Sequence, residues 1–333
     1  MSWEWTTETR AGLDAYLAAK GLFDGTPEIA RIGDGHSNQT FLITSGAQRM
    51  ILRRPPPPPL EKGSNDMLRE ARIIGALAGT GVPVPRVLAV AQEGELFDVP
   101  FYIMEYLPGV VITTDLPPAF SGADAARAMG FAMVDAMAAL HGVDWAARGL
   151  EDFGRPEGFN ARHLRRIAGV LTGPQGPIPP EFAAVHAWLA ANVPPESGAT
   201  IIHNDLRLGN LMWSSEAPVV LAALDWELAT LGDPLMDLAY LVSSVPLAGL
   251  PQTPTQQLAT AALTPGFPTS EALIARYVER TGTDPSHLAW HLAMVNWKLA
   301  VLYRFSRLRG VDAYFADPQQ VPLFLGEAAR HIG

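Results

Sequence analysis

The chain of 333 residues contains no cysteine. A disulfide scaffold, a zinc site built on cysteine and a thiol nucleophile are therefore excluded. Basic residues are also few, because 24 Lys and Arg stand against 34 Asp and Glu, which gives a formal net charge of −10. Nucleic acids and anionic membranes are bound by basic surfaces, so the composition predicts neither as a partner.

Long uninterrupted apolar runs are missing as well. The two most apolar stretches, residues 131–140 and 292–303, carry Asp135 in the first and Asn296 and Lys298 in the second, which argues against a membrane span. The N-terminus opens no signal peptide, since no basic segment leads into an apolar run. With 48% hydrophobic residues to build a core, we expect a soluble, cytoplasmic protein.

The composition changes near the Pro108-Gly109 break, and this change predicts two parts, residues 1–107 and 108–333. Before the break, strand-like runs dominate, with one helix at the start of the chain and one inside the strand-rich region. After it, helical patterns dominate, except for a strand-like island over residues 200–225. The predicted strands are 28–32, 40–44, 50–53, 84–90 and 101–107, and the predicted helices are 7–20, 64–78, 122–141, 160–171, 181–192, 234–242, 270–281, 285–309 and 318–331.

Polar residues cluster inside the strand-like island. His203, Asp205 and Asn210 lie in a short loop with apolar residues on both sides, and Asp225 follows a second apolar strand. Phosphoryl transfer needs a carboxylate that orients and deprotonates the attacking hydroxyl, and oxygen ligands that hold Mg²⁺ against the phosphates. Asp205 fits the first role, and Asn210 with Asp225 fits the second. Oxygen donors without sulfur or clustered imidazole indicate Mg²⁺ rather than zinc.

The motif His203-x-Asp205-x-x-x-x-Asn210, followed by Asp225-Trp226-Glu227, resembles the catalytic loop and metal-binding motif of the aminoglycoside phosphotransferase and choline kinase branch of protein-kinase-like enzymes. The resemblance covers nearly the whole chain. It implies an α+β fold of two lobes: a small N-terminal lobe with an antiparallel sheet and one main helix, and a larger, mostly helical C-terminal lobe. It also implies ATP or GTP as the phosphate donor, and a small-molecule hydroxyl as the acceptor.

The same resemblance implies a nucleotide site in residues 1–107. Its parts are the glycine-rich turn with Ser37 and Asn38, the cation Arg53 in place of the usual lysine, Glu70 as the partner of that cation, and backbone groups of Glu105 and Leu107 around the adenine. Each part also has a plainer interpretation. The turn alone reads as a hairpin, and Arg53 with Glu70 as an ordinary surface ion pair.

Further motifs, Leu52-Arg53-Arg54-Pro55 and the run from Asp225 to Pro234, resemble phosphotransferase domains fused to, or encoded beside, acyl-CoA dehydrogenases. That subgroup implies a hydroxyacyl-CoA or a similar hydroxy acid as acceptor. The chain departs from the branch at Asn204, where glycine is usual.

Several roles stay open at this point. Asp205 is also a residue type that caps turns, His203 is expected to shape the loop rather than act as the base, and Glu227 suits either a ligand contact or a structural hydrogen bond. Asp233 and Asp237 are expected to have structural roles, as caps or as supports for the loop. Lys298 and Arg304 fall on one predicted helix, where scattered solvated bases are favoured over contact with an anionic acceptor.

Three functions compete with the leading one. An aminoglycoside kinase would need acidic groups for a polycationic substrate, and the bases on the predicted helix 285–309 weigh against it. A nucleotide-binding pseudokinase is disfavoured because Asp205, Asn210 and Asp225 are all present. A protein kinase is disfavoured because Asp225 and Pro234 leave no room for a long activation segment.

Overall fold

The computed structural model describes residues 5–23, 25–33, 38–56, 65–173, 176–310 and 313–332. Contacts divide the chain into two compact units. The N-terminal unit comprises Met1–Pro108 with the short segment Asp225–Ala229, and the C-terminal unit comprises Gly109–Leu224 with Thr230–Gly333. Residues 225–229 fall within the predicted part 108–333, yet in the structure they pack with the N-terminal unit.

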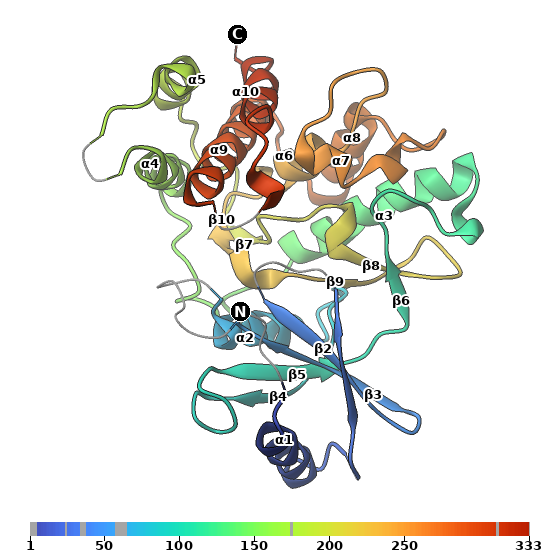
Figure 1. Ribbon diagram of the computed structural model, residues 1–333. Coiled ribbons are helices and arrows are strands. Elements are labelled where there is room, and N and C mark those ends of the chain that lie inside the picture. The colour runs from blue at the N-terminus through green and yellow to red at the C-terminus, as the bar shows by residue number, and fades with distance from the viewer. Residues whose placement is uncertain are drawn as a thin grey trace. The chain divides into compact units, whose positions relative to one another are not determined.

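The N-terminal unit is built on one antiparallel sheet (Figure 1), as the predicted fold class requires. The strand order is β1-β2-β3-β5-β4. Strand β2 shows the expected period of two, because Phe41 and Ile43 are buried while the residues between them are half-buried. The strands are β1 (Glu28–Ile32), β2 (Gln39–Ser45), β3 (Gln48–Arg54), β4 (Val87–Ala91) and β5 (Phe101–Glu105).

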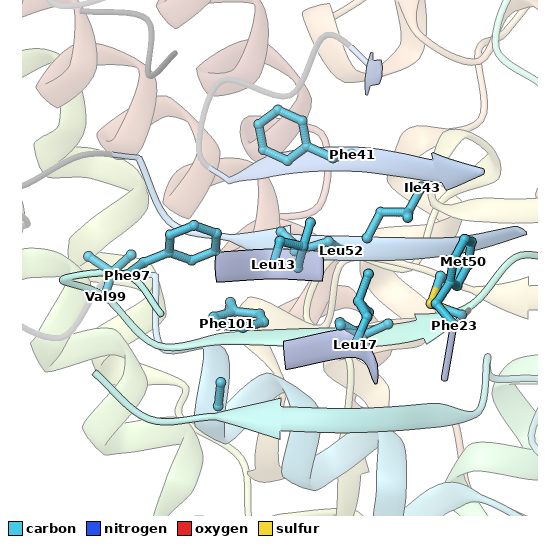
Figure 2. Close-up of a cluster of buried hydrophobic side chains, with 12 residues drawn as sticks. Leu13, Leu17, Phe23, Phe41, Ile43, Met50, Leu52, Phe97, Val99 and Phe101 are labelled. Carbon is cyan, nitrogen blue, oxygen red and sulfur yellow. The ribbon is translucent and has the colours of Figure 1, made fainter. Parts of the chain in front are cut away.

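Helix α1 (Thr7–Ala19) supplies the apolar cover for this sheet. Thr6 caps the helix through the amide of Thr9. Its Leu13 and Leu17 join a buried cluster with side chains of β2, β3 and β5 (Figure 2). The second helix, α2 (Met67–Leu77), is capped by Asp66 and packs against β4, β5 and the short 3-10 helix η3 (Trp226–Leu228). The predicted cap Ser64 lies outside the described residues.

The C-terminal unit is mostly helical (Figure 1), with two small antiparallel sheets that frame the polar loop. Strand β7 (Thr200–Ile202) pairs with β10 (Thr230–Gly232), and β8 (Leu211–Ser214) pairs with β6 (Gly109–Val111) and β9 (Val220–Ala223). The helices are α3 (Ala123–His141), α4 (Phe159–Thr172), α5 (Pro180–Ala191), α6 (Leu235–Ser244), α7 (Pro254–Gln257), α8 (Ser270–Thr281), α9 (Leu288–Arg309) and α10 (Gln320–Ala329).

Helix α9 is the packing centre of this unit, because α4, α5, α6 and α10 all contact it. Most of its residues from Leu288 to Tyr303 are buried, including Asn296 and Lys298. The favoured picture of a solvated helix with scattered bases is therefore wrong for this part of α9. Within the described chain, no helix combines the length and the apolarity that a membrane crossing requires.

Candidate active site

The polar loop between β7 and β8 brings Asp205 and Asn210 together. The Asn210 side-chain amide donates to Asp205 twice, to the backbone oxygen and to carboxylate Oδ2, each at 2.8 Å. The 3-10 helix η2 (Leu208–Asn210) turns the chain so that this contact forms across five residues. The Asp205 side chain keeps 20% of its surface exposed. The Asp205 carboxylate is therefore fixed by hydrogen bonds and still accessible from solution.

A fully buried carboxylate, Asp237, fixes the start of this loop. Its two oxygens accept from the backbone amides of His203, at 2.6 Å, and Asn204, at 2.7 Å. His141 Nε2 lies 3.3 Å from the same carboxylate, and His141 Nδ1 lies 2.6 Å from the Tyr277 hydroxyl. Burial alone would raise the pKa of Asp237, but the hydrogen bonds and charge of His141 and His203 hold it below its ordinary value. Asp237 thus supports the loop, as expected from the sequence.

His203 holds the other side of the loop. Its Nε2 lies 2.9 Å from the Leu224 carbonyl oxygen, and the Leu224 amide donates to the Asn210 carbonyl at 2.8 Å. These contacts tie the loop to the end of β9, one residue before Asp225. His203 therefore shapes the loop, in agreement with its expected structural role.

Asn204, the departure from the branch, has a conformational explanation. Its φ is +67°, in the left-handed region that glycine and asparagine adopt with least strain. We expect Asn204→Gly to change the free energy of unfolding by less than about 1 kcal/mol, and Asn204→Val to lower it by more than about 1 kcal/mol. Urea titration of the three proteins measures this order. Equal stability of the glycine and valine variants would contradict it.

Arg53 in the N-terminal unit forms two ion pairs. Its Nε lies 3.2 Å from the Glu70 carboxylate, and its Nη2 lies 2.5 Å from Asp225 Oδ1. Burial opposes the charged form of Arg53, but Glu70, Tyr102 and Asp225 together raise its pKa above the ordinary value. Arg53 is therefore a permanent cation. Because Glu70 is 1% exposed, the interpretation of a surface ion pair is wrong for these residues.

Glu70 is held by three groups of the N-terminal unit. Besides Arg53, the Tyr102 hydroxyl and the Trp226 amide bond to its carboxylate. Burial raises the pKa of Glu70, and the charge of Arg53 opposes that rise. The segment Asp225–Ala229 thus helps to position the Arg53–Glu70 pair.

Asn38 turns its carboxamide inward. Its Nδ2 donates to Glu227 Oε2 at 3.0 Å, and its Oδ1 accepts from Asn65 Nδ2 at 2.8 Å. Both polar groups of the side chain are thereby engaged within the N-terminal unit. Glu227 makes the structural hydrogen bond that was one of its two expected roles. Ser37, the other predicted phosphate contact, lies outside the described residues.

The predicted adenine contacts lie at the end of β5. The Glu105 amide donates to the Arg86 carbonyl at 2.9 Å, and the Glu105 carboxylate accepts from the Arg86 amide at 2.7 Å. The Glu105 amide is therefore used internally. Leu107 follows the strand and is half-buried, and its backbone groups make no hydrogen bond with the described residues.

The described residues contain no group of three His, Cys, Asp or Glu side chains placed to hold a metal ion. The two predicted ligands nevertheless have suitable chemistry. Asn210 bonds to Asp205 through its nitrogen, which leaves its carboxamide oxygen available, and Asp225 retains Oδ2 beside the oxygen that Arg53 binds. Few hard oxygen ligands are typical of Mg²⁺, which takes the rest of its shell from phosphates and water.

Three residues around Asp205 were not predicted to belong with it. Arg207 Nε lies 3.6 Å from Asp205 Oδ1. Tyr240 hydrogen-bonds to the Asp205 carboxylate, and burial and that negative charge raise its pKa well above the ordinary value. Lys298 lies with its ammonium over the Tyr240 ring, 5.3 Å from the centroid. Arg207 stands inside the motif, but nothing in the sequence marks Tyr240 on α6 or brings α9 to the loop.

Comparison with known proteins places this chain in a family. A model of the phosphotransferase enzyme family matches residues 28–291. Acyl-CoA dehydrogenase family member 10 of Mus musculus is 32% identical over 312 residues, which cover 90% of this chain and 27% of that protein. Member 11 of Homo sapiens is 29% identical over 295 residues, which cover 87% of this chain and 37% of that protein. The chain spans about a third of the length of these relatives.

Solved structures of similar proteins have the same fold. A Ralstonia eutropha protein assigned to the aminoglycoside phosphotransferases is 28% identical, with a TM-score of 0.80 over 97% of each chain. Aminoglycoside 2'-phosphotransferase-IIIa, in its GDP complex, is 14% identical with a TM-score of 0.65 over 98% of each chain, and shows the fold alone. The kinase-like α+β fold and the resemblance found in the sequence are confirmed. The chain belongs to the phosphotransferase enzyme family.

Proposed function

We propose that this chain transfers the γ-phosphate of a nucleoside triphosphate to a hydroxyl group of a small molecule. The observation that carries the proposal is the environment of Asp205. Its partly exposed carboxylate accepts a hydrogen bond from Asn210, and Asp237 fixes the start of the same loop through the His203 and Asn204 amides. Such a carboxylate suits a base that orients an attacking hydroxyl and takes its proton. The alternative of a turn cap does not account for its exposure or for the buried support.

In the proposed reaction, the acceptor oxygen bonds to the γ-phosphorus while the bond from that phosphorus to the leaving diphosphate oxygen breaks. The hydroxyl proton passes to Asp205. Arg53, held by Glu70, binds the negative phosphate tail. Asn210 and Asp225 are proposed to hold Mg²⁺, which when bound supplies positive charge against the phosphates.

We further propose a hydroxy acid or a hydroxyacyl-CoA as the acceptor. Support comes from the relatives named as acyl-CoA dehydrogenases, which carry a segment similar to this chain. Aminoglycosides are the competing class, since structural neighbours are aminoglycoside phosphotransferases. The basic side chains near Asp205 favour an anionic acceptor over a polycation.

Acceptor-dependent ADP or GDP release tests both the proposed kinase activity and the proposed acceptor class. We expect hydroxy acids or hydroxyacyl-CoAs to raise the release rate at least tenfold above the rate with water alone, and kanamycin and hygromycin B to leave it unchanged. Release with an aminoglycoside would overturn the acceptor class and keep the kinase. No response to any hydroxyl compound, with nucleotide still bound, would support the pseudokinase instead. Running ATP and GTP in parallel identifies the donor.

A further inference from the structure

Lys298 is an unusual residue for the interior of α9. It is 5% exposed, although a lysine is almost never buried without a partner for its charge. Its ammonium lies 5.3 Å from the centroid of the Tyr240 ring, a cation–π contact. No carboxylate oxygen of the described residues lies within 4.0 Å of Lys298 Nζ. The Tyr240 ring is thus a direct contact of the buried ammonium.

The charges that act on Lys298 come from three neighbouring elements. Asp205 of the loop and Asp237 of α6 favour its ammonium form, and Arg166 of α4 opposes it. Asp237 already accepts hydrogen bonds from the His203 and Asn204 amides. Of the two carboxylates, Asp205, the proposed base, attracts the Lys298 ammonium more strongly.

Charged groups of both signs lie around that base. Lys298 and Arg166 are cationic, Arg207 pairs with Asp205 at 3.6 Å, and Asp205 and Asp237 carry the negative charges that act on Lys298. His163 on α4, whose Nδ1 lies 3.3 Å from the Arg166 guanidinium, adds no positive charge, because burial and the charges of Lys298 and Arg166 keep its pKa well below the ordinary value. Of the other helices that pack on α9, α5 directs Glu181 to Arg304 and His186 to the Trp297 ring, and α10 pairs Glu327 with Arg330.

We propose that Lys298 binds the carboxylate of a hydroxy-acid acceptor and so places its hydroxyl beside Asp205. This inference rests on the proposed function and makes its acceptor class specific. A carboxylate at Lys298 would give the buried ammonium the charge-assisted hydrogen bond that the Tyr240 ring does not supply. A polycationic acceptor would meet Lys298, Arg166 and Arg207 with repulsion.

Binding of matched acceptors to the full chain tests this proposal without requiring turnover. The probes are hydroxy acids of four to six carbons with the hydroxyl at C2, C3 or C4, each paired with its primary amide, measured by titration calorimetry. We expect Lys298→Met to weaken acid binding about ten- to a hundredfold, and amide binding less than about twofold. Methionine fills a similar volume without the charge, so the core keeps its packing.

Lys20→Met is the matched control, since Lys20 also lies 5.3 Å above a tyrosine ring, that of Tyr16, but is exposed on the N-terminal unit. It should change neither affinity. Equal binding of acid and amide by the unmodified protein, or unchanged acid binding by Lys298→Met, would refute the role of Lys298. Failure of the proposed function looks different: the acid binds through Lys298, but no ADP or GDP is released.

The pH dependence gives a second measurement that needs no variant. Burial lowers the pKa of Lys298 to about 8, against the opposing charges of Asp205 and Asp237. Below that pH the side chain is an ammonium and binds the acid; above it the amine is neutral and the attraction is lost. Acid affinity should therefore stay level from pH 6.5 to 7.5 and fall above pH 8, while amide affinity stays level throughout. A level profile for the acid up to pH 9.5 would contradict the inference.

Discussion

Asp205→Asn should lower kcat by about 10²- to 10⁴-fold and leave the dissociation constant of the nucleotide within about twofold. Asparagine preserves the shape of the side chain and can still accept the hydrogen bond from Asn210, which is 2.8 Å long. It cannot take the proton of an attacking hydroxyl. The loss should therefore fall on the chemical step, measured by single-turnover phosphate transfer to whichever acceptor is active.

The control for this variant is Asp135→Asn. Asp135 pairs with Arg276 at 2.9 Å on the surface of α3 and α8, so the substitution removes a carboxylate without touching the loop. Full kcat is expected for the control. An Asp205→Asn protein that turns over at the unmodified rate would remove Asp205 from the role of base, while a protein that loses nucleotide binding as well would indicate a folding defect rather than lost catalysis.

The largest effect on stability is expected at Asp237. Asp237→Ala should lower the free energy of unfolding by about 3–5 kcal/mol, because it strands the buried His141 side chain and the backbone amides of His203 and Asn204. The two amides are the donors that fix the loop, so the remaining folded protein should also lose activity. Urea unfolding followed by tryptophan fluorescence gives the free energy.

Asp135→Ala provides the comparison at the surface. The Asp135–Arg276 pair is about a third exposed on each side, with 34% and 28% of the side chains accessible, and should contribute no more than about 1 kcal/mol. Similar losses from both alanine variants would show that burial of Asp237 does not set its contribution. Normal stability of Asp237→Ala would mean that water or a rearranged loop satisfies the two amides.

Local patterns predicted most of the elements. The strand over residues 28–32 and the helix over residues 270–281 have the predicted bounds. For the helix the reason is local, because its cap, Thr269, bonds to the amide of Ala272 only three residues away. The helix ends shifted where a different residue forms the cap, as at Asp66 of α2. The family resemblance, carried by the spacing from His203 to Asp225, added the fold that local patterns cannot specify.

Contacts between distant residues were harder to predict. Asp237 was expected to support the loop, yet its bonds to His203 and Asn204 span more than thirty residues and depend on how α6 packs. Lys298 was predicted on the correct helix but in a solvated environment. Buried residues occupy every face of α9 between Leu288 and Tyr303, so the helical period does not show which polar residues of this helix are exposed. The charged groups near Asp205 come from α4, α9 and the loop together, so no single segment of the sequence encodes their arrangement.

The segment Asp225–Ala229 has a consequence for how this protein can be divided and made. A fragment that ends at Pro108 would lack Asp225, the partner of Arg53, and the Trp226 amide that holds Glu70. On a ribosome, the N-terminal unit therefore stays incomplete until residue 229 has emerged, when much of the C-terminal unit is already synthesised. Completion of the Arg53–Glu70 pair is in this way coupled to synthesis of the loop from His203 to Asn210, and neither unit corresponds to a contiguous stretch of the chain.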